Sequence, residues 1–263
     1  MLLDEVDDDG FLVVPVAAID DRYRELVDRC TDAVVASVPS LAAVLLYGSV
    51  ARGRATPPHS DLDLLAVVAD PAARPHVQRL AVQLTARHAA EVHDVGVTVV
   101  TRAELLADDL DGMGNRAFLK HSCVPVWGAD IGATLAPARP TPQLAWAYNH
   151  SVGRAVDACR SDLAISCTPT EVAVVARRAA RRTLLACASL ASVRTGRWTT
   201  DREVAVAFVD ERHPSWADDA HAAMQWCHEP TYDRVEAAVF LDGFAAWVVA
   251  ELADACGEPP ERA

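Results

Sequence analysis

The fold of this chain is decided by the stretch Leu45-Leu46-Tyr47-Gly48-Ser49-Val50-Ala51-Arg52-Gly53, followed after a short spacer by Ser60-Asp61-Leu62-Asp63-Leu64-Leu65. The apolar run 41–46 predicts a buried strand, and the Gly-Ser turn after it lets backbone N–H groups and a hydroxyl approach an anion closely. The second stretch alternates polar and apolar residues with the period of a strand, so both carboxylates emerge on one face. Two carboxylates this close repel each other unless divalent cations neutralise them. The pattern therefore predicts a magnesium site for a nucleoside triphosphate.

This pattern of Gly-Ser, a spacer and Asp-x-Asp resembles the signature of the nucleotidyltransferase superfamily named after DNA polymerase β. The sequence of residues 46–49 and 59–65 is most similar to that of the small aminoglycoside (streptomycin/spectinomycin) adenylyltransferases. The specific motif covers residues 41–68, and the segments 119–128 and 194–197 show weaker similarity. The resemblance implies a Mg²⁺-dependent adenylyltransferase that moves AMP from ATP to a hydroxyl of a small molecule, such as an aminoglycoside-type antibiotic, with release of pyrophosphate.

The resemblance also implies roles for the residues that match the motif. Asp61 and Asp63 are expected to hold Mg²⁺ against the triphosphate, and Gly48 and Ser49 to bind its β- and γ-phosphates. Ser60 is expected to add a hydroxyl to the phosphates or to the metal.

Arg52 is a further phosphate-binding candidate, because it lies one helical turn beyond the Gly-Ser turn. A solvated surface arginine is the alternative interpretation of this residue.

The third carboxylate of the site is the point at which the chain departs from the family. Related enzymes place an acid on a neighbouring strand, where it binds metal and takes the proton of the acceptor hydroxyl. Here the matching position is Gly96, and Asp94 begins the same predicted strand, 94–100. On a regular strand residues 94 and 96 share a face. We therefore predict Asp94 as metal ligand and general base, with Glu91 as a weaker candidate, and the competing interpretation is that the site lacks a third acid.

The charge balance of the chain limits its partners. Of its 263 residues, 37 are acidic and 24 basic, which gives a net charge of −13. Nucleic-acid binding requires a basic surface, so this charge balance argues against it. The negative charge is instead expected to attract a cationic small molecule. The N-terminus is acidic where a secretory signal is positively charged, and no apolar run reaches membrane-spanning length. We therefore expect a cytoplasmic protein that binds neither nucleic acid nor membrane; the sequence gives no indication of its oligomeric state.

The sequence predicts an α+β architecture with a sheet-containing first half and an all-helical second half. A nucleotidyltransferase domain is expected over 1–136 and a helical substrate-binding domain over 137–263, with the boundary in the proline-rich segment 136–142. The first half is predicted to hold helices at 18–37, 74–90, 102–109 and 113–121 and strands at 41–46, 61–68, 94–100 and 124–127, with an edge strand or docked tail at 11–16. The second half is predicted to hold helices at 143–163, 169–194, 200–211, 215–228 and 231–256.

Two features of the helical half invite a functional interpretation. Arg177, Arg178, Arg181 and Arg182 form two i, i+4 pairs, which bind the nucleotide's phosphates, contact an anionic acceptor or pair with surface acids. Trp198 is predicted either to stack on an adenine or sugar or to lie in the core. The nucleotide-binding lysine that the family places shortly after this glycine-containing turn is replaced here by Asp201.

Two other classes of protein share the same motif. An antitoxin-type or regulatory nucleotidyltransferase-fold protein, which acts on or binds a protein partner, and a non-catalytic nucleotide-binding module both contain Gly-Ser and Asp-x-Asp. The long helical half favours a small-molecule acceptor over the antitoxin-type or regulatory protein, and only the open question of the third acid supports the non-catalytic module.

Overall fold

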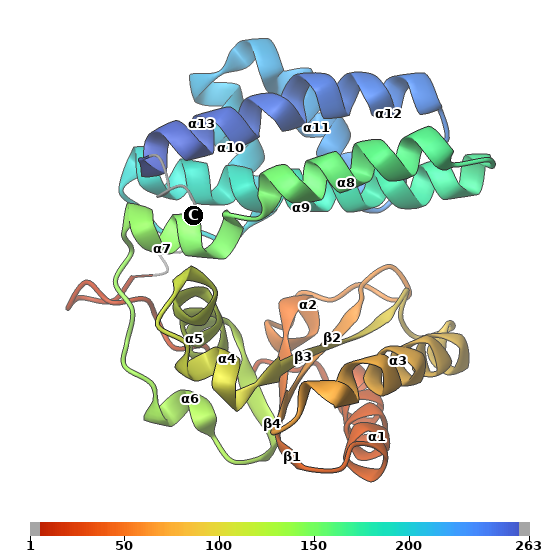
Figure 1. The fold of residues 1–263 in the computed structure, drawn as a ribbon, viewed down its shortest axis with the longest axis vertical. Coiled ribbons are helices and arrows are strands. Elements are labelled where there is room, and N and C mark those ends of the chain that lie inside the picture. Colours follow the sequence, from red (N-terminus) through yellow and green to blue (C-terminus); the bar gives the residue numbers. More distant parts are fainter. Residues whose placement is uncertain (1–5, 258–263) are drawn as a thin grey trace. The chain divides into compact units, whose positions relative to one another are not determined.

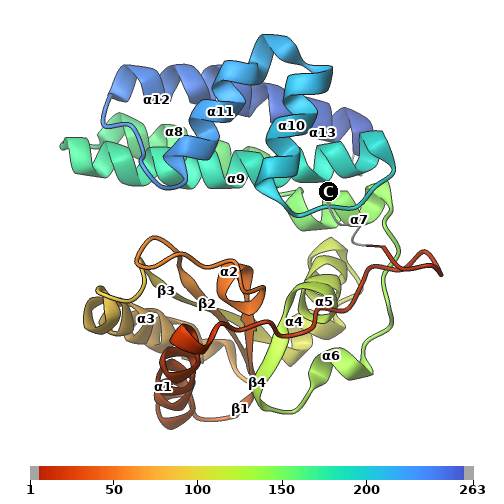
Figure 2. The same ribbon diagram turned by 180° about the vertical axis from the view of Figure 1, so that it is seen from behind.

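The computed structural model describes residues 6–257, which divide into two compact units. One unit spans Val13–Ala138, and the other comprises, within the described residues, 6–12 and 139–257 (Figures 1 and 2). The N-terminal residues join the helical unit partly through Arg139, whose guanidinium carbon lies 3.9 Å from the centre of the Phe11 ring. The division falls within the proline-rich segment 136–142.

The first unit is built on a four-stranded mixed sheet, as the sequence predicts. Its strands are β1 (Leu41–Tyr47), β2 (Leu62–Val68), β3 (Val95–Thr101) and β4 (Val124–Gly128), in the order β3-β2-β1-β4. β1 is antiparallel to both β2 and β4, whereas β2 and β3 are parallel. The parallel pair is connected through α3, which packs on β3, because parallel strands need a crossover connection.

Helices cover both faces of this sheet, and the alternation of side chains along β2 sorts its residues between them. α1 (Asp21–Ser37) and α3 (Arg74–His88) bury one face, which includes Leu62 and Leu64 of β2. α4 (Arg102–Leu106) and α5 (Leu110–Ser122) bury the other face, which includes Leu65 and Val67. By the same alternation, the side chain of Asp63 belongs to the α4/α5 face. The short helices α2 (Gly48–Ala51), η1 (Pro71–Ala73) and α6 (Ile131–Thr134) complete the unit.

The predicted edge strand at 11–16 is absent, and its alternative, a docked tail, describes the segment. Regular pairing near it is limited, within the described residues, to an isolated bridge between Val6 and Leu12. Pro15 lacks the N–H that a strand would contribute. The tail is instead held by single hydrogen bonds, such as that between His121 Nδ1 and the Val13 carbonyl, 3.1 Å apart.

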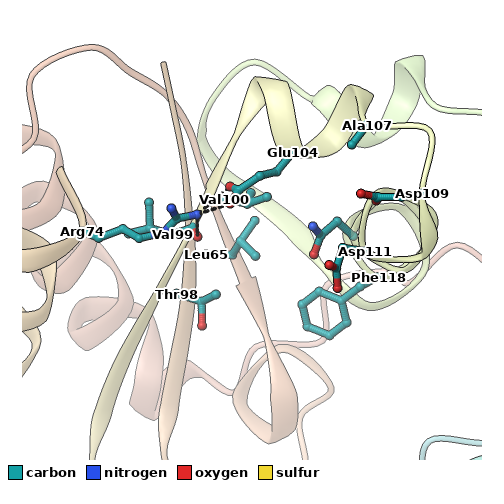
Figure 3. A pocket seen from close by; sticks show the side chains of 11 residues that line it. Leu65, Arg74, Thr98, Val99, Val100, Glu104, Ala107, Asp109, Asp111 and Phe118 are labelled. Carbon is teal, nitrogen blue, oxygen red and sulfur yellow. Dashed lines mark hydrogen bonds and ion pairs between the residues drawn. The ribbon is translucent and has the colours of Figure 1, made fainter. Parts of the chain in front are cut away.

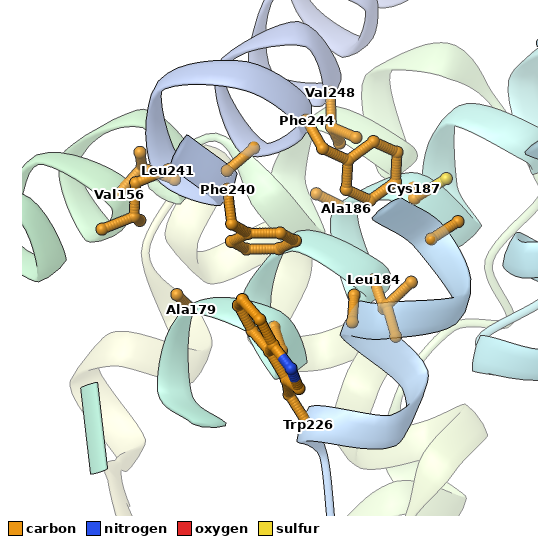
Figure 4. Packing of buried hydrophobic residues seen from close by; sticks show 14 of the residues in the cluster. Val156, Ala179, Leu184, Ala186, Cys187, Trp226, Phe240, Leu241, Phe244 and Val248 are labelled. Atoms are coloured by element: carbon orange, nitrogen blue, oxygen red, sulfur yellow. The ribbon is translucent and has the colours of Figure 1, made fainter. Parts of the chain in front are cut away.

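The second unit is all-helical, and the 27-residue helix α9 is its centre. α9 packs against the six other α-helices of this unit, among them α10 and α11. Figure 4 shows the core that results, in which the tilted rings of Trp226, Phe240 and Phe244 lie near Leu184 of α9. The helices are α7 (Pro142–Asn149), α8 (Val152–Ile165), α9 (Pro169–Thr195), α10 (Arg202–Arg212), α11 (Ala217–Trp226), α12 (Arg234–Phe240) and α13 (Ala246–Cys256), with short helical turns at Pro214–Trp216 and Leu241–Ala245.

Two predicted helices of this unit are interrupted. The segment 143–163 breaks between α7 and α8 at His150 and Ser151, although the apolar period continues across the break. The segment 231–256 contains a π-helical turn at Leu241–Ala245, which hydropathy patterns do not reveal. By contrast, α9 begins at the expected Thr168/Glu171 capping box and ends at Gly196 in the left-handed conformation.

Over residues 6–257, the helices are too short or too polar for any of them to traverse a bilayer.

Candidate active site

The carboxylate of Asp63 lies between two glycines from neighbouring strands. In the sheet, Asp63 pairs with Tyr47 of β1, the residue before Gly48, and with Gly96 of β3. A Cβ added to Gly48 would come within 2.5 Å of Asp63 Oδ2, and one added to Gly96 within 3.3 Å of Oδ1. Gly48 also has a φ of +79°, which favours glycine at this turn. The two glycines therefore leave the space that this carboxylate occupies.

Asp61 precedes β2 and lies at the same end of the sheet, with only 8% of its surface exposed. Next to it, Ser60 closes a tight loop: its hydroxyl accepts a hydrogen bond from the Thr56 N–H at 2.8 Å. The Ser60 carbonyl accepts another from the His93 N–H, which links this loop to the start of β3. In this structure, Ser60 thus stabilises the loop that positions Asp61 at the start of β2.

The Gly-Ser turn opens α2 immediately after β1, as the sequence predicts. Ser49 lies in the first turn of α2, where backbone N–H groups have no partner within the helix. Its carbonyl accepts a hydrogen bond from the Arg54 N–H at 2.9 Å, which folds the chain back after the helix. Arg52 forms the C-cap of α2 and is exposed.

Asp94, the predicted third carboxylate, is turned toward α3. Its Oδ1 accepts a hydrogen bond from the Thr85 hydroxyl at 2.6 Å, and the same hydroxyl accepts one from the Val95 N–H at 2.9 Å. The residue beside Asp63 on β3 is Gly96. The structure therefore brings Asp61 and Asp63 to one end of β2 and places Asp94 in a hydrogen-bonded junction between β3 and α3.

The weaker candidate, Glu91, is engaged elsewhere. It accepts hydrogen bonds from His88 at 2.8 Å and from Arg29 at 2.7 Å. The hydrogen bond to His88 is the main reason that the pKa of Glu91 is lowered, with Arg29 contributing and burial opposing. Glu91 thus helps to join α1 and α3.

The two aspartates suit a magnesium ion. Mg²⁺ in proteins is commonly held by one or two carboxylates together with substrate phosphates and water. Asp61 and Asp63 supply two carboxylates, and the Gly-Ser turn beside them leaves room for phosphates. Within residues 6–257, no group of three His, Cys, Asp or Glu side chains is arranged as a ready metal site. The ligand set would therefore be completed by the nucleotide and solvent.

A polar cavity of about 380 Å³ opens one residue pair farther along the same face of the sheet. Leu65 follows Asp63, and Thr98 follows Gly96, with the spacing of two residues that keeps side chains on one face. Figure 3 shows these sheet residues facing Asp109, Asp111 and Phe118 of the α5 segment. The sequence pattern did not predict this cavity, although the alternation along β3 places Thr98 on the same face as Gly96.

Among the charged side chains that line this cavity, the acidic ones outnumber the basic ones. Glu104, Asp109 and Asp111 supply three carboxylates, and Arg74 supplies one guanidinium. Arg74 donates a hydrogen bond to Glu104 Oε2 at 2.6 Å, so the opposite charges of these two side chains offset each other. The arrangement suits a hydroxylated or cationic group.

An aromatic pair borders the same part of the sheet. The Tyr47 hydroxyl lies 3.1 Å from the Thr98 hydroxyl, so the Tyr47 side chain crosses from β1 over β2 to β3. Its ring meets the edge of Phe118 with centroids 5.0 Å apart. These rings fix the position of the Tyr47-Gly48 turn relative to β3.

In the helical unit, the residues for which the sequence suggested a functional role differ in their surroundings: one is buried, one forms an ion pair and one is exposed. Trp198 is only 4% exposed and lies edge-on to Tyr148, with ring centroids 5.5 Å apart. The Trp198 ring is therefore buried and packs against α7, as expected for a structural tryptophan. Arg178 pairs with Asp162, as expected for a surface ion pair, and Arg182 is exposed.

Comparisons with known proteins agree with this geometry. Residues 27–111 match the family model described as a nucleotidyltransferase domain. The sequence has no match among curated proteins.

Two solved structures describe the fold further. Spectinomycin adenyltransferase AAD(9) from Enterococcus faecialis, solved with ATP and spectinomycin, is similar with a TM-score of 0.56 and 14% identity, over 86% of this chain and 98% of that one. A toxin–antitoxin structure with AMP-PNP matches 39% of this chain and 73% of that one, with 20% identity and a TM-score of 0.28. A sheet-containing unit followed by a helical unit is thus a fold shared with AAD(9), and residues 27–111, which carry the Gly-Ser turn and the Asp-x-Asp strand, match the nucleotidyltransferase domain model.

Proposed function

We propose that this protein is a Mg²⁺-dependent adenylyltransferase that moves AMP from ATP to a hydroxyl of a small molecule and releases pyrophosphate. The observation that carries the proposal is the placement of Asp63 between Gly48 and Gly96, with Asp61 at the same end of β2, inside a nucleotidyltransferase domain. Within this proposal, the predicted domain roles stand: 1–136 holds the nucleotide and 137–263 helps to select the acceptor.

In this mechanism, the protein's main task is to position charges. Asp61 and Asp63 hold Mg²⁺, which supplies charge neutralisation on the triphosphate and lowers the pKa of the attacking hydroxyl. Gly48 allows the turn to approach the β- and γ-phosphates closely, and Ser49 offers them a hydroxyl. Arg52, exposed at the end of α2, is proposed to approach the same phosphates.

The acceptor's proton requires a base within hydrogen-bond reach. We retain Asp94 as the proposed base and third metal ligand. This role requires the Asp94 carboxylate to leave Thr85 when substrates bind. The competing hypothesis, a site without a third acid, is supported by Gly96 as the immediate neighbour of Asp63.

For the acceptor, we propose a hydroxylated, cationic molecule of the aminoglycoside type. Three observations support this: the net charge of −13, the acidic cavity beside the aspartate pair, and the fold shared with an enzyme solved with spectinomycin. Modification of such an antibiotic would confer resistance to it.

The direct test is to incubate the purified protein with Mg²⁺, each of the four NTPs and a panel of hydroxylated antibiotics, and to search by mass spectrometry for a nucleoside monophosphate adduct. We expect an AMP adduct. The Asp61→Asn and Asp63→Asn variants should lose at least about 10²- to 10³-fold in rate, the loss typical of removing a key electrostatic contact.

Asp32→Asn is the matched control, because Asp32 is an exposed carboxylate on α1 of the same unit. It should retain the wild-type rate. Near-normal transfer by either aspartate variant would contradict the metal assignment, and the absence of an adduct with every NTP and acceptor would contradict adenylyl transfer to this class of acceptor.

A further inference from the structure

The cavity between the sheet and α5 lies close to the aspartate pair. All of its lining residues belong to Val13–Ala138, so it is a feature of the first unit. On its sheet side, Leu65 lies two residues beyond Asp63 on one face of β2, and Thr98 lies two residues beyond Gly96 on β3. At about 3.3 Å per residue, this spacing is about 7 Å. A molecule in the cavity can therefore extend a neighbouring group to a phosphate held beside Asp63.

Glycine at position 96 leaves this route open on β3. The nearest contact that a Cβ added to Gly96 would make is with Asp63 Oδ1, at 3.3 Å. Because alternate residues of a strand share a face, Thr98 carries the first side chain on this face of β3 beyond the level of Asp63. The space beside the Asp63 carboxylate is thus continuous with the space beside Thr98.

A pair of hydroxyls lies where the cavity meets the sheet. Tyr47 pairs with Asp63 in the antiparallel register of β1 and β2, so its side chain lies on the same face. The Tyr47 and Thr98 hydroxyl oxygens are 3.1 Å apart. A hydroxyl has one proton and two lone pairs, so the Thr98 hydroxyl can bond a further group while it keeps this bond.

An aromatic ring lines the cavity from the α5 side. Phe118 of α5 and Thr98 of β3 both contribute to its lining (Figure 3). The Tyr47 ring packs on Phe118 in a T-shaped arrangement, with centroids 5.0 Å apart and an angle of 76° between the ring planes. Tyr47 is thus held by Phe118 at its ring and by Thr98 at its hydroxyl, and this gives the Thr98 hydroxyl a defined direction.

These groups suit a hydroxylated ring. A small-molecule site combines apolar and aromatic surface with a few placed polar groups, and its volume is about 300–1,000 Å³. At about 380 Å³, this cavity lies near the lower end of that range. Asp109 and Asp111 add carboxylates to the lining, which favour amino substituents and disfavour the anionic triphosphate. The cavity therefore suits a ring of the acceptor better than it suits the nucleotide.

We propose that this cavity binds a hydroxylated ring of the acceptor, and that Thr98 forms a hydrogen bond with one of the ring's hydroxyls. Tyr47 is a positioning residue, which orients the Thr98 hydroxyl. The ring hydroxyl that Thr98 binds differs from the one that receives AMP, because Thr98 is about 7 Å beyond the level of Asp63. This inference rests on the proposed function, since it assigns the cavity to the acceptor of that reaction.

The test measures binding to the full-length protein without ATP and Mg²⁺, so it does not depend on AMP transfer. The probes are 2-deoxystreptamine, a ring with amino and hydroxyl groups, and cis-1,3-diaminocyclohexane, which keeps the ring and the amino groups and lacks the hydroxyls. Ligand-observed NMR titration gives both Kd values. We expect 2-deoxystreptamine to bind more tightly, by about 2- to 10-fold for each hydrogen bond of a ring hydroxyl. Equal affinities would mean that the hydroxyls are not recognised.

Substitutions at the hydroxyl pair test the assigned residues. Thr98→Val suits a strand and removes the hydroxyl, so it should weaken binding of 2-deoxystreptamine about 2- to 10-fold and leave that of the diamine unchanged. Thr98→Ser should restore the affinity. Tyr47→Phe keeps the ring and should cause a smaller loss, also confined to 2-deoxystreptamine; an equal loss for both probes would refute its positioning role. Thr134→Val, at an exposed threonine of α6, is the matched control and should bind both probes like wild type.

Ala107→Phe locates the site independently of these hydrogen bonds. Ala107 lines the cavity, and a phenyl ring at this position would occupy part of it. This variant should lose the binding of both probes. Val82→Phe, at a 71% exposed residue of α3 outside the cavity lining, is its control and should bind them normally.

The outcomes separate this site from the proposed function. No binding of 2-deoxystreptamine, or binding that neither Thr98→Val nor Ala107→Phe weakens, overturns the cavity assignment. A loss of ATP binding in Thr98→Val equal to the loss for the probe would assign the cavity to the nucleotide and overturn the proposal as well. A protein that binds the probe as expected and forms no AMP adduct would contradict the adenylyl transfer and leave the ring site in place.

Discussion

At the scale of single residues, the site depends on the space around one carboxylate. Asp63 fits between β1 and β3 because Gly48 and Gly96 carry no side chain at the two points where it would meet one. Gly48 tolerates a side chain less well than Gly96 does, because its φ is positive and an added Cβ would also come closer to the Asp63 carboxylate. A glycine can thus be tested as a part of the site in the same way as a charged residue.

Gly48→Ala should abolish most AMP transfer. The added Cβ would lie 2.5 Å from Asp63 Oδ2 and displace it, and the φ of +79° adds about 1–2 kcal/mol of backbone strain. Displacement of a reacting group by about 1 Å costs on the order of 10²-fold in rate. The measurement is kcat together with the free energy of unfolding.

Gly196→Ala is the control for strain alone, because Gly196 has a φ of +72° and no atom lies within 4 Å of its added Cβ. It should lose similar stability and keep its rate per folded molecule. A Gly48→Ala enzyme that behaves like Gly196→Ala would show that Asp63 is free to move without cost to catalysis.

The two hypotheses for the third acid predict opposite results at two neighbouring positions. If Asp94 is the base, Asp94→Ala should lower the rate by orders of magnitude while nucleotide binding largely persists. If the third acid is absent, Asp94→Ala should matter little, and Gly96→Glu should raise the rate by adding a carboxylate beside Asp63. A Cβ at Gly96 meets Asp63 Oδ1 at 3.3 Å, which requires only a small adjustment.

Thr85→Val tests whether the position of the Asp94 carboxylate affects the rate separately from the presence of that carboxylate. It removes the hydroxyl that donates to Asp94 at 2.6 Å and leaves the carboxylate in place. A rate that is unchanged in Asp94→Ala would refute our assignment of the base.

At the scale of secondary-structure elements, α4 is held by a capping box that also borders the cavity. Glu104 accepts a hydrogen bond from the Thr101 N–H at 2.7 Å, and its own N–H donates to the Thr101 hydroxyl at 3.1 Å. Burial raises the pKa of Glu104, but the hydrogen bonds from Arg74 and Thr101 outweigh burial and leave that pKa below its ordinary value of 4.5. α4 is therefore attached to the end of β3 by an ionised carboxylate.

This attachment should make stability depend on pH. Because the folded-state pKa of Glu104 is lowered, its contribution is fully present above pH of about 4.5 and is lost as the pH falls through the folded-state pKa. Glu104→Gln should lower the free energy of unfolding at pH 7 by about 1 kcal/mol or less, since the side chain is 40% exposed. The loss of stability between pH 5 and pH 3, measured by urea unfolding, should be smaller in this variant than in wild type.

Glu25→Gln is a suitable comparison, because Glu25 pairs with Arg29 on the surface of α1 and its side chain is 84% exposed. It should leave the pH profile nearly unchanged. Identical profiles for Glu104→Gln and wild type would mean that the capping box does not contribute to acid sensitivity.

At the scale of the whole molecule, nucleotide binding should be visible as stability. A ligand that binds only the native state adds about 2.7 kcal/mol when present at about 100 times its Kd. We therefore expect ATP with Mg²⁺ to raise the Tm by several degrees, and EDTA to remove the part of the shift that depends on Asp61 and Asp63. Differential scanning fluorimetry with wild type and Asp63→Asn measures this part, and a shift of equal size in both would exclude the aspartate pair as the nucleotide's metal site.

The properties that could be predicted from the sequence are those encoded by short-range patterns. The alternation in Asp61-Leu62-Asp63-Leu64 predicted the strand β2, and the apolar run before Gly48 predicted β1, because side-chain direction along a strand follows from backbone geometry alone. The mixed sheet followed by helices is likewise confirmed. The motif at residues 41–68 was sufficient to indicate a nucleotidyltransferase domain.

Contacts between distant segments required the tertiary structure. Residues 63 and 96 become neighbours only through the parallel register of β2 and β3, and Asp94 turns to Thr85 because α3 packs against the start of β3. The cavity at Thr98 exists because α5 lies over that face. On α9, the helical period shows that Arg177 and Arg181 share a face, but the packing of the neighbouring helices decides that both are half-buried. Such contacts depend on how whole elements pack, and that is determined by the sum of many side-chain contacts far apart in the sequence.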